Sequence, residues 1–333
     1  MVPIAAGLGP RRFYRLELDQ CRVSSAIARI DLPEERTLRP DGAAPEPELE
    51  PVRQWMEDGG LPVPRGYARE DGIDLLEDLG SQNLADAVDD ADPATRFELY
   101  RAAAQLVPRI QKLSLEAGLA SCRRSLDAPL IDYKAQQVIE WVLPWSLGRA
   151  PRPSEVEALR DAFRHIAEVC IEAPRRAAHR DFQSTNLILL PPEAHGHDRL
   201  GMIDLQGAFV APPEYDLVCL LRDAHVALSE SEVAAHLSRT RPQLPDAPAE
   251  TDFDHRFTLL TVSRCGKDLA RFRYAAMHRN DRRYTPLIPA VAQSVRTAAL
   301  RAAPWDVRLE RVAHLLGSLP EAAHRDLQEA ERP

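Results

Sequence analysis

The chain has 333 residues and a formal net charge of −9, and hydrophobic residues make up 44% of it. This balance is typical of a soluble globular protein long enough for two lobes, and the acidic charge argues against a nucleic-acid partner, whose phosphates call for a basic face. No apolar run approaches the roughly 18 residues that a membrane-spanning helix requires, and the five cysteines form no CxxC pair of the kind that binds zinc. We therefore expect a cytoplasmic protein with no nucleic-acid partner and no membrane partner. The sequence carries no pattern that specifies an oligomeric state.

Residues 1–80 predict a small β-rich lobe. Gly7 and Gly9 precede the first strand pattern and are typical of a turn between two strands. The other expected elements of this lobe are strands at 11–18, 25–30 and 72–80, a loop at 33–51 that contains five prolines, and a helix from about Pro51 to the glycines at 59–60.

From about residue 85 the pattern becomes helical. Apolar side chains recur three or four positions apart in residues 97–110 and again in residues 156–169, which predicts two helices with core-facing stripes. Between them, Glu140 and Trp145 bound the run EWVLPW. A tryptophan in such a run packs in the core or binds a sugar ring, and both interpretations stay open.

The stretch from His179 to Asp204 contains the residue types that phosphoryl transfer requires. Asp181 and Asn186 are five residues apart, and Asp204 follows a short apolar run. Phosphoryl transfer needs a carboxylate that orients the attacking hydroxyl and accepts its proton, and oxygen ligands for magnesium. Protein kinases supply them in the same order, as HRD, four residues, Asn and a later Asp. We therefore predict Asp181 as the catalytic carboxylate, and Asn186 and Asp204 as catalytic ligands of Mg²⁺.

The segment that follows, IDLQGAFVAPPEYDLVCLLRDA, resembles the aminoglycoside-phosphotransferase-like family of small-molecule kinases. Within that family it is most similar to bacterial anomeric sugar kinases that act on N-acetylmuramate and N-acetylglucosamine. Leu205 replaces an aromatic residue of their pattern, and Gly207 replaces an acid. The resemblance implies a two-lobed, protein-kinase-like α+β fold with a β-rich nucleotide-binding lobe (1–80) and a mainly helical catalytic and substrate lobe (81–333). It also implies that Asp216 anchors the catalytic loop, although a helix N-cap is an alternative.

By the same resemblance the cofactors are ATP and Mg²⁺. The nucleotide-binding residues it implies are Gly7, Gly9, Arg11 and Arg12 over the phosphates, and Glu77 and Leu79 at the adenine hinge. The phosphate-pairing lysine of kinases is absent, because the first lysine of the chain is Lys112. Arg29 is the candidate substitute, with Glu48 or Glu50 as its partner, and a solvated strand arginine is the alternative.

The expected acceptor is a small sugar-like molecule. Its candidate contacts are Gln206, Glu140, Trp145, Arg264 and Lys267. Arg264 and Lys267 are three residues apart, so they share a helix face and suit either an anionic ligand or a solvated surface. The predicted reaction moves the γ-phosphoryl group of ATP to a hydroxyl of a sugar or amino sugar, including an anomeric hydroxyl. An aminoglycoside or choline-type phosphotransferase and a nucleotide-binding pseudokinase are the alternatives. A protein kinase is disfavoured, because Asp216 follows Asp204 too soon for an activation segment.

Overall fold

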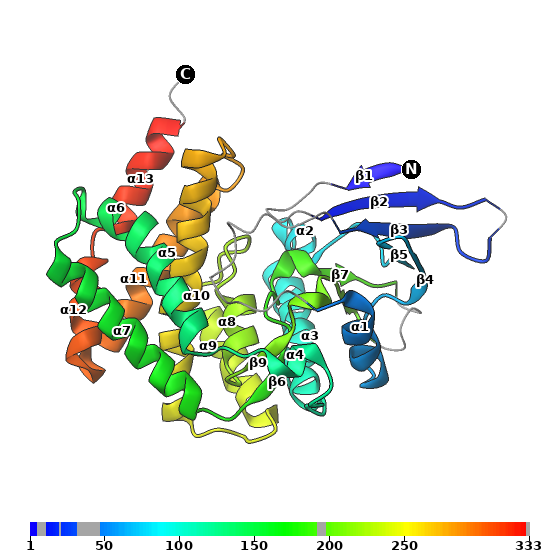
Figure 1. Cartoon of the computed structure of the whole chain (residues 1–333), viewed down its shortest axis with the longest axis horizontal. Helices are drawn as coiled ribbons and strands as arrows, with labels where there is room; N and C mark the ends of the chain where they lie inside the picture. Colours follow the sequence, from blue (N-terminus) through cyan, green and yellow to red (C-terminus); the bar gives the residue numbers. More distant parts are fainter. Residues whose placement is uncertain (5–10, 20, 32–46, 192–197, 331–333) are drawn as a thin grey trace.

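The computed structural model describes residues 1–4, 11–19, 21–31, 47–191 and 198–330, so the predicted Gly7 and Gly9 lie outside the described residues. The described chain forms a β-sheet lobe and a larger helical lobe that lie side by side (Figure 1). The predicted boundary at residues 80–81 falls within the connection between these lobes.

The N-terminal lobe is one antiparallel sheet with the strand order β1-β2-β3-β5-β4. Its strands are β1 (Val2–Ile4), β2 (Arg12–Glu17), β3 (Ser25–Ile30), β4 (Gly66–Glu70) and β5 (Ile73–Glu77). The predicted strand at 25–30 is confirmed with its bounds, and the other two are confirmed with shorter ends. In the register of β3 and β5, Arg29 lies opposite Asp74.

Helix α1 (Leu49–Asp58) packs its apolar residues, including Trp55, into a core that also contains Leu76 of β5. It begins two residues before the expected start. Pro51 therefore lies in the first turn, where a missing N–H leaves no intrahelical hydrogen bond unmade. The helix ends at Gly59, as predicted.

The segment that joins the lobes is fixed from both sides. Arg15 of β2 forms an ion pair with Asp78 at 2.7 Å and donates a hydrogen bond to the Gly80 carbonyl at 2.9 Å. Leu79, which lies between Asp78 and Gly80, forms a small buried cluster with Ile188 and Leu190 of the helical lobe. The connection is thus held to the sheet by charge and to the helical lobe by apolar packing.

The helical lobe has a large core built around α10, which spans 29 residues and packs against α5 and α11. Its helices are α2 (Leu84–Asp89), α3 (Pro93–Gln111), α4 (Ala120–Arg123), α5 (Ala128–Trp141), α6 (Leu143–Leu147), α7 (Pro153–Glu172), α8 (Tyr215–Leu221), α9 (Glu230–Thr240), α10 (Glu250–His278), α11 (Ile288–Ala302), α12 (Val307–Leu315) and α13 (Leu319–Ala330). The predicted stripes at 97–110 and 156–169 are confirmed as α3 and α7. Two short antiparallel sheets of two strands each complete the lobe: β6 (Arg176–Ala178) pairs with β9 (Phe209–Ala211), and β7 (Leu187–Leu189) forms a hairpin with β8 (Leu200–Met202).

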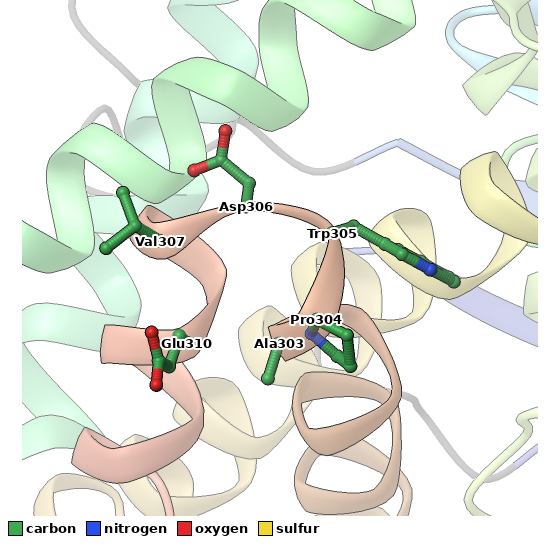
Figure 2. Close-up of a pocket in the computed structure, with 6 residues that line it drawn as sticks. All are labelled: Ala303, Pro304, Trp305, Asp306, Val307 and Glu310. Carbon is green, nitrogen blue, oxygen red and sulfur yellow. The ribbon is translucent and has the colours of Figure 1, made fainter.

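An open hollow of about 450 Å³ lies where α11 turns into α12 (Figure 2). Its wall includes Trp305 and Val307, whose side chains are largely exposed. None of the predicted site residues lines it. Among the described residues, no helix combines the length and apolar character needed to cross a membrane.

Candidate active site

The hairpin of β7 and β8 brings the predicted magnesium ligands together. Leu187 pairs with Met202 in this hairpin. Asn186 directly precedes Leu187 and Asp204 is the second residue after Met202, so both lie at the same end of the hairpin. A hydrogen bond of 3.0 Å from the Ile203 N–H to the Asn186 carbonyl continues the pairing to that end. Two residues that are 18 positions apart in the sequence therefore become neighbours through an ordinary antiparallel register.

The side chain of Asn186 is oriented by Asp181. Asn186 Nδ2 donates a hydrogen bond of 2.8 Å to the backbone carbonyl of Asp181, which leaves the amide oxygen to act as a ligand. Asp204 has a left-handed backbone (φ 64°), and its Oδ1 accepts hydrogen bonds from Gln206 Nε2 at 2.5 Å and Arg11 Nη1 at 3.1 Å. The Asp204 side chain is about one-third exposed, so a ligand can reach its carboxylate.

The donor set fits Mg²⁺. An amide oxygen and a carboxylate are hard oxygen ligands, and Mg²⁺ in kinase sites takes its remaining ligands from phosphates and water. In the described part of the chain, no group of three or more His, Cys, Asp or Glu side chains converges on one point. Asn186 and Asp204 are the residues that would hold the ion.

Asp216 anchors the catalytic loop, as predicted. Its carboxylate accepts the backbone N–H groups of His179 at 2.7 Å and Arg180 at 3.0 Å. It does not cap α8, whose N-cap residue is Glu214. His179 in turn places its ring Nε2 3.0 Å from the Ile203 carbonyl, which ties the loop to the residue before Asp204. Burial raises the pKa of the Asp216 carboxyl to about 6, and the neighbouring Asp181 also raises it.

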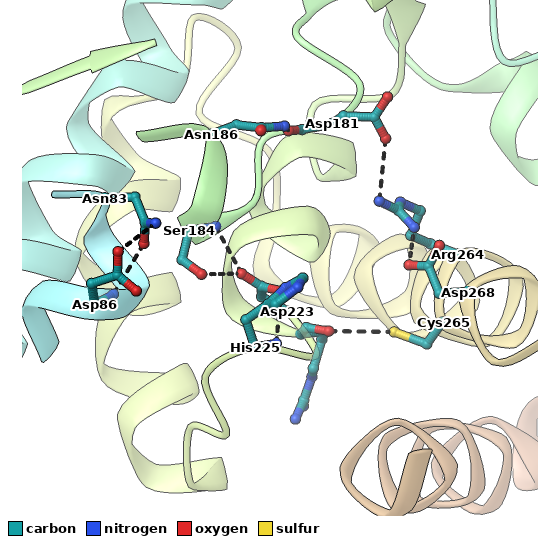
Figure 3. A network of polar contacts seen from close by, with 11 residues as sticks. Asn83, Asp86, Asp181, Ser184, Asn186, Asp223, His225, Arg264, Cys265 and Asp268 are labelled. Atoms are coloured by element: carbon teal, nitrogen blue, oxygen red, sulfur yellow. Dashed lines mark hydrogen bonds and ion pairs between the residues drawn. The ribbon is translucent and has the colours of Figure 1, made fainter. Parts of the chain in front are cut away.

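A second buried carboxylate, Asp223, holds the other end of the loop (Figure 3). It accepts hydrogen bonds from the Ser184 N–H at 2.7 Å and from the Ser184 hydroxyl, and His225 Nδ1 lies 2.9 Å from its other oxygen. Burial opposes ionisation of Asp223, but His225 and Ser184 lower its pKa below the ordinary value. Sequence reasoning missed this clamp, because no local spacing links Ser184 to a residue 39 positions away.

Four basic side chains lie near the carboxylate of Asp181, the predicted catalytic residue. Arg264 of α10 places Nη2 3.4 Å from Asp181 Oδ1, and Arg264 and Lys267 both form ion pairs with Asp268 (Figure 3 shows Arg264 and its two partners). Burial would raise the pKa of Asp181. The charges of the four cations, Arg180, Arg264, Lys267 and Arg271, outweigh burial and hold that pKa well below its ordinary value. Asp181 is therefore ionised at neutral pH.

The structure thus brings the predicted Arg264 and Lys267 near Asp181 and adds Arg271, which sequence reasoning missed. The signal was present, because positions 264, 267 and 271 recur at the helical interval and so share one face of α10. Burial and the charges of Arg264 and Arg271 also hold the pKa of Lys267 well below its ordinary value.

Gln206 and Gly207 complete the wall beside Asp204. Gln206 is buried and donates to the Asp204 carboxylate, and its backbone carbonyl lies 3.4 Å from Arg124 Nη1. A Cβ atom at Gly207 would lie 3.4 Å from Asp181 Oδ2. An acid at position 207 would therefore place a second carboxylate beside Asp181, and this chain has none there.

The predicted strand cation, Arg29, is almost fully buried and pairs with two carboxylates. Its guanidinium contacts Asp74 at 2.5 Å and Asp31 at 2.7 Å. The expected glutamate partner was wrong: among the described contacts, Glu48 pairs with Arg69 and Glu50 with Arg53. The partner comes instead from the adjacent strand, because Asp74 lies opposite Arg29 in the sheet.

The other predicted nucleotide residues come from β2, from the residue before it, and from the end of β5 and the connection that follows. Arg11 contacts Asp204, and Arg12 Nη1 donates to the Arg11 carbonyl at 3.1 Å. Glu77, the last residue of β5, accepts a hydrogen bond from the Arg65 N–H, and Leu79 lies two residues further along the connection. Their roles in binding nucleotide stay predictions.

Two predicted acceptor contacts come from α5 and α6. Glu140 is exposed near the end of α5, and Trp145 lies in α6 with one ring face covered by the Arg273 guanidinium at 4.0 Å. Within the described residues, neither shares a hydrogen bond or ion pair with Asp181, Asn186 or Asp204. Their proposed contact with substrate stays a prediction.

The fold and the site together define a small-molecule kinase of the protein-kinase-like class, which transfers a phosphoryl group to a hydroxyl acceptor. The chain belongs to the phosphotransferase enzyme family, whose model matches residues 1–253. It is 28% identical over 293 residues to an N-acetylmuramate/N-acetylglucosamine kinase of Pseudomonas aeruginosa, covering 85% of this chain and 82% of that protein. It is 26% identical over 304 residues to a protein of the same name from Neisseria meningitidis, covering 89% of this chain and 85% of the relative.

Solved structures with the same fold include small-molecule kinases of several kinds. An ethanolamine kinase of Plasmodium vivax matches with a TM-score of 0.57 and 11% identity, covering 89% of this chain and 81% of that one. A choline kinase of Streptococcus pneumoniae matches with a TM-score of 0.55 and 15% identity, covering 88% and 95%. At such low identities these likenesses establish the fold alone.

Proposed function

We propose that the protein uses ATP and Mg²⁺ to phosphorylate a hydroxyl of an amino sugar, at the anomeric position of N-acetylmuramate or N-acetylglucosamine. The observation that carries the proposal is the meeting of Asp181, Asn186 and Asp204 at one end of a hairpin, in a chain whose curated relatives bear the name of that activity.

In this mechanism the chain's own residues orient the reactants. The acceptor hydroxyl donates a hydrogen bond to Asp181, its oxygen forms a bond to the γ-phosphorus, and the bond from that phosphorus to the β–γ bridging oxygen breaks, releasing ADP. The hydroxyl proton passes to the Asp181 carboxylate. Asn186 and Asp204 would hold Mg²⁺, which supplies positive charge to the transferring phosphates.

The depressed pKa of Asp181 bears on the choice of acceptor. A carboxylate stabilised by four cations is a weak base, so it is suited to a hydroxyl that gives up its proton readily. An anomeric hydroxyl is more acidic than the other hydroxyls of a sugar, because the ring oxygen withdraws electron density from the same carbon. The electrostatics of the site therefore favour the anomeric position.

The same cations favour an acceptor with negative charge. N-acetylmuramate carries a carboxylate, whereas N-acetylglucosamine is neutral and aminoglycosides and choline are cationic. The four basic side chains near Asp181, whose charge Asp181 and Asp268 offset only in part, attract the first and repel the last two. We therefore expect the acidic amino sugar to have the highest kcat/KM.

The test is ADP release by the purified protein with MgATP across N-acetylmuramate, N-acetylglucosamine, glucose, choline and aminoglycosides. Phosphorylation of the two N-acetylated sugars, with ³¹P NMR placing the phosphate on the anomeric carbon, is the expected result. Turnover with choline or an aminoglycoside alone would show that this compound, and not an amino sugar of the proposed kind, is the acceptor. ATP binding without turnover on any acceptor would favour a pseudokinase.

Gly207 offers a sharper check on acceptor charge. In Gly207→Asp a carboxylate would lie beside Asp181 and repel an anionic acceptor, whereas in Gly207→Ala the added Cβ lies at 3.4 Å from Asp181 Oδ2, an ordinary contact. We expect the aspartate to lower the preference for N-acetylmuramate over N-acetylglucosamine about tenfold, on the scale of one charge–charge contact, and the alanine to leave it unchanged. An unchanged preference in both variants would argue against a charge-selecting site.

A further inference from the structure

We infer that Arg271 of α10 binds the carboxylate of an anionic acceptor, and that this contact distinguishes N-acetylmuramate from neutral amino sugars. The inference rests on the proposed function, since it names the residue that selects among acceptors of the same active site. It also gives the basic side chains on one face of α10 separate roles.

The first step is the position of Arg271. Arg264, Lys267 and Arg271 follow one another in α10 at intervals of three and four residues, so they share one face of the helix. Arg264 places Nη2 3.4 Å from Asp181 Oδ1. Arg271 comes two turns later, about 10 Å further along the helix axis, and its charge still interacts with that of Asp181. A ligand held at Asp181 therefore meets Arg271 on the same wall of the site.

The second step concerns the two cations that lie between Asp181 and Arg271. Arg264 forms ion pairs with Asp181 and Asp268, and Lys267 Nζ lies 2.6 Å from Asp268 Oδ1. The side chains of Arg264 and Lys267 are only 5% and 13% exposed. A carboxylate on a ligand would have to displace these protein carboxylates from largely buried cations, which is costly. Arg264 and Lys267 thus hold Asp181 and Asp268 in place.

Arg271 differs from them in exposure and in partners. It is exposed, and within the described residues it makes no hydrogen bond and no ion pair. Burial by the surrounding protein nevertheless lowers the pKa of its guanidinium, and attraction to the Asp181 carboxylate opposes that effect. A cation that water reaches although protein surrounds it lies in a concave part of the surface. There an entering anion is attracted more strongly than on an open face, because solvent screens the charges less.

The third step is the shape of the acceptor. In N-acetylmuramate the lactyl ether is attached to a ring carbon other than the anomeric carbon. Its carboxylate and its reacting hydroxyl therefore project from different positions of the ring, as a ligand that contacts both Asp181 and Arg271 requires. A planar guanidinium can bind a carboxylate through two parallel N–H bonds. N-acetylglucosamine has no lactyl group, so it would leave Arg271 in contact with water.

The experiment measures kcat/KM for N-acetylmuramate and for its carboxamide, a neutral analogue of nearly the same shape, at saturating MgATP. The ratio of the two values isolates the contact with the carboxylate, because an effect of Arg271 on Asp181 changes both acceptors alike. We expect the wild type to prefer the acid about tenfold, the scale of one charge-assisted contact. The ratio should fall close to one in Arg271→Met and should take an intermediate value in Arg271→Lys, which keeps the charge. Arg311→Met, which removes an exposed arginine from α12, is the matched control and should keep the wild-type ratio.

A wild-type ratio in Arg271→Met overturns the inference, and so does a wild type that accepts the acid and the amide equally well. If Arg271→Met raises KM for ATP and leaves the ratio unchanged, Arg271 serves the nucleotide and the inference is again wrong. In each of these cases the wild type still phosphorylates amino sugars, so the proposed function stands. A wild type that phosphorylates neither N-acetylmuramate nor N-acetylglucosamine overturns the proposed function, and the inference with it.

Discussion

Asp181 and Asp204, the two carboxylates that we propose to be catalytic, lie in different electrostatic surroundings. Asp181 lies among four cations, whereas Asp204 contacts Gln206 and Arg11. We expect Asp181→Asn and Asp204→Asn each to lower kcat by about 10³-fold or more, since each removes a charge that acts in the transition state. Steady-state kinetics, with circular dichroism as a check of folding, measures both.

The dependence on magnesium distinguishes the two variants. Asp204→Asn should raise the Mg²⁺ concentration that gives half-maximal rate, because it weakens a ligand, whereas Asp181→Asn should leave that concentration unchanged. A loss of less than tenfold in either variant would remove that residue from the mechanism.

The raised pKa of Asp216 predicts an unusual pH dependence of stability. Its carboxyl has a pKa of about 6 in the folded protein, against about 4 in an unfolded chain. Between these values the folded state holds a proton that the unfolded state has released, so this group's contribution to the free energy of unfolding falls as pH rises. Relative to Asp216→Asn, which does not titrate, the wild type should lose about 2 kcal/mol between pH 4 and pH 7.

Urea denaturation of both proteins across that range measures the difference. The second loop clamp offers a contrast, because the pKa of Asp223 is lowered by His225 and Ser184 against the effect of burial. Ionised Asp223 stabilises the folded state at pH values above its unfolded pKa. The free energy of unfolding of the wild type, relative to that of Asp223→Asn, should therefore decrease as the pH falls toward the folded pKa. Equal, pH-independent differences for both variants would contradict this account.

Among the elements, the hairpin of β7 and β8 has the predicted metal ligands at one end and also packs against the connection between the lobes. Gly201 of β8 is buried, and a Cβ there would lie 2.7 Å from Leu79 Cδ1 and 3.1 Å from Leu190 Cδ2. We expect Gly201→Ala to lower the free energy of unfolding by about 1–2 kcal/mol through overpacking. It should also weaken ATP binding by displacing Leu79, the predicted hinge residue. Gly118→Ala is the control, because nothing lies within 4 Å of its Cβ position. If Gly201→Ala is as stable as the wild type, Leu79 moves aside without loss of stability and the overpacking argument is wrong.

The elements that the sequence predicted well are those whose signals are local. The strand at 25–30 and the stripes of α3 and α7 each lie within one short stretch, where spacing and residue type carry the information. Asp181, Asn186 and Asp204 were singled out by the same kind of local pattern, and their roles stay predictions. These features need only neighbours in the chain to be recognised.

The features that sequence reasoning missed depend on contacts between distant positions. Asp74 replaces the expected glutamate because the register of β3 and β5 sets it opposite Arg29, and no spacing rule gives that register. The same holds for the Ser184–Asp223 clamp and for the contact of Arg11 with Asp204. Each joins residues tens to hundreds of positions apart, so only the folded chain brings their charges together.

For the whole molecule, binding of MgATP between the lobes should appear as a gain in thermal stability. A ligand that binds only the folded state adds RT ln(1 + [L]/Kd), about 2.7 kcal/mol at one hundred times Kd, which raises Tm by a few degrees for a chain of this size. ATP with a chelator should give a smaller shift, because Asn186 and Asp204 then hold no ion. In Asp204→Asn the shifts with and without Mg²⁺ should become nearly equal, whereas Asp181→Asn should keep the wild-type difference. Differential scanning fluorimetry measures the shift with and without Mg²⁺ for all three proteins. If the wild type gains equally from ATP with and without Mg²⁺, the two oxygens at the end of the hairpin are not a metal site.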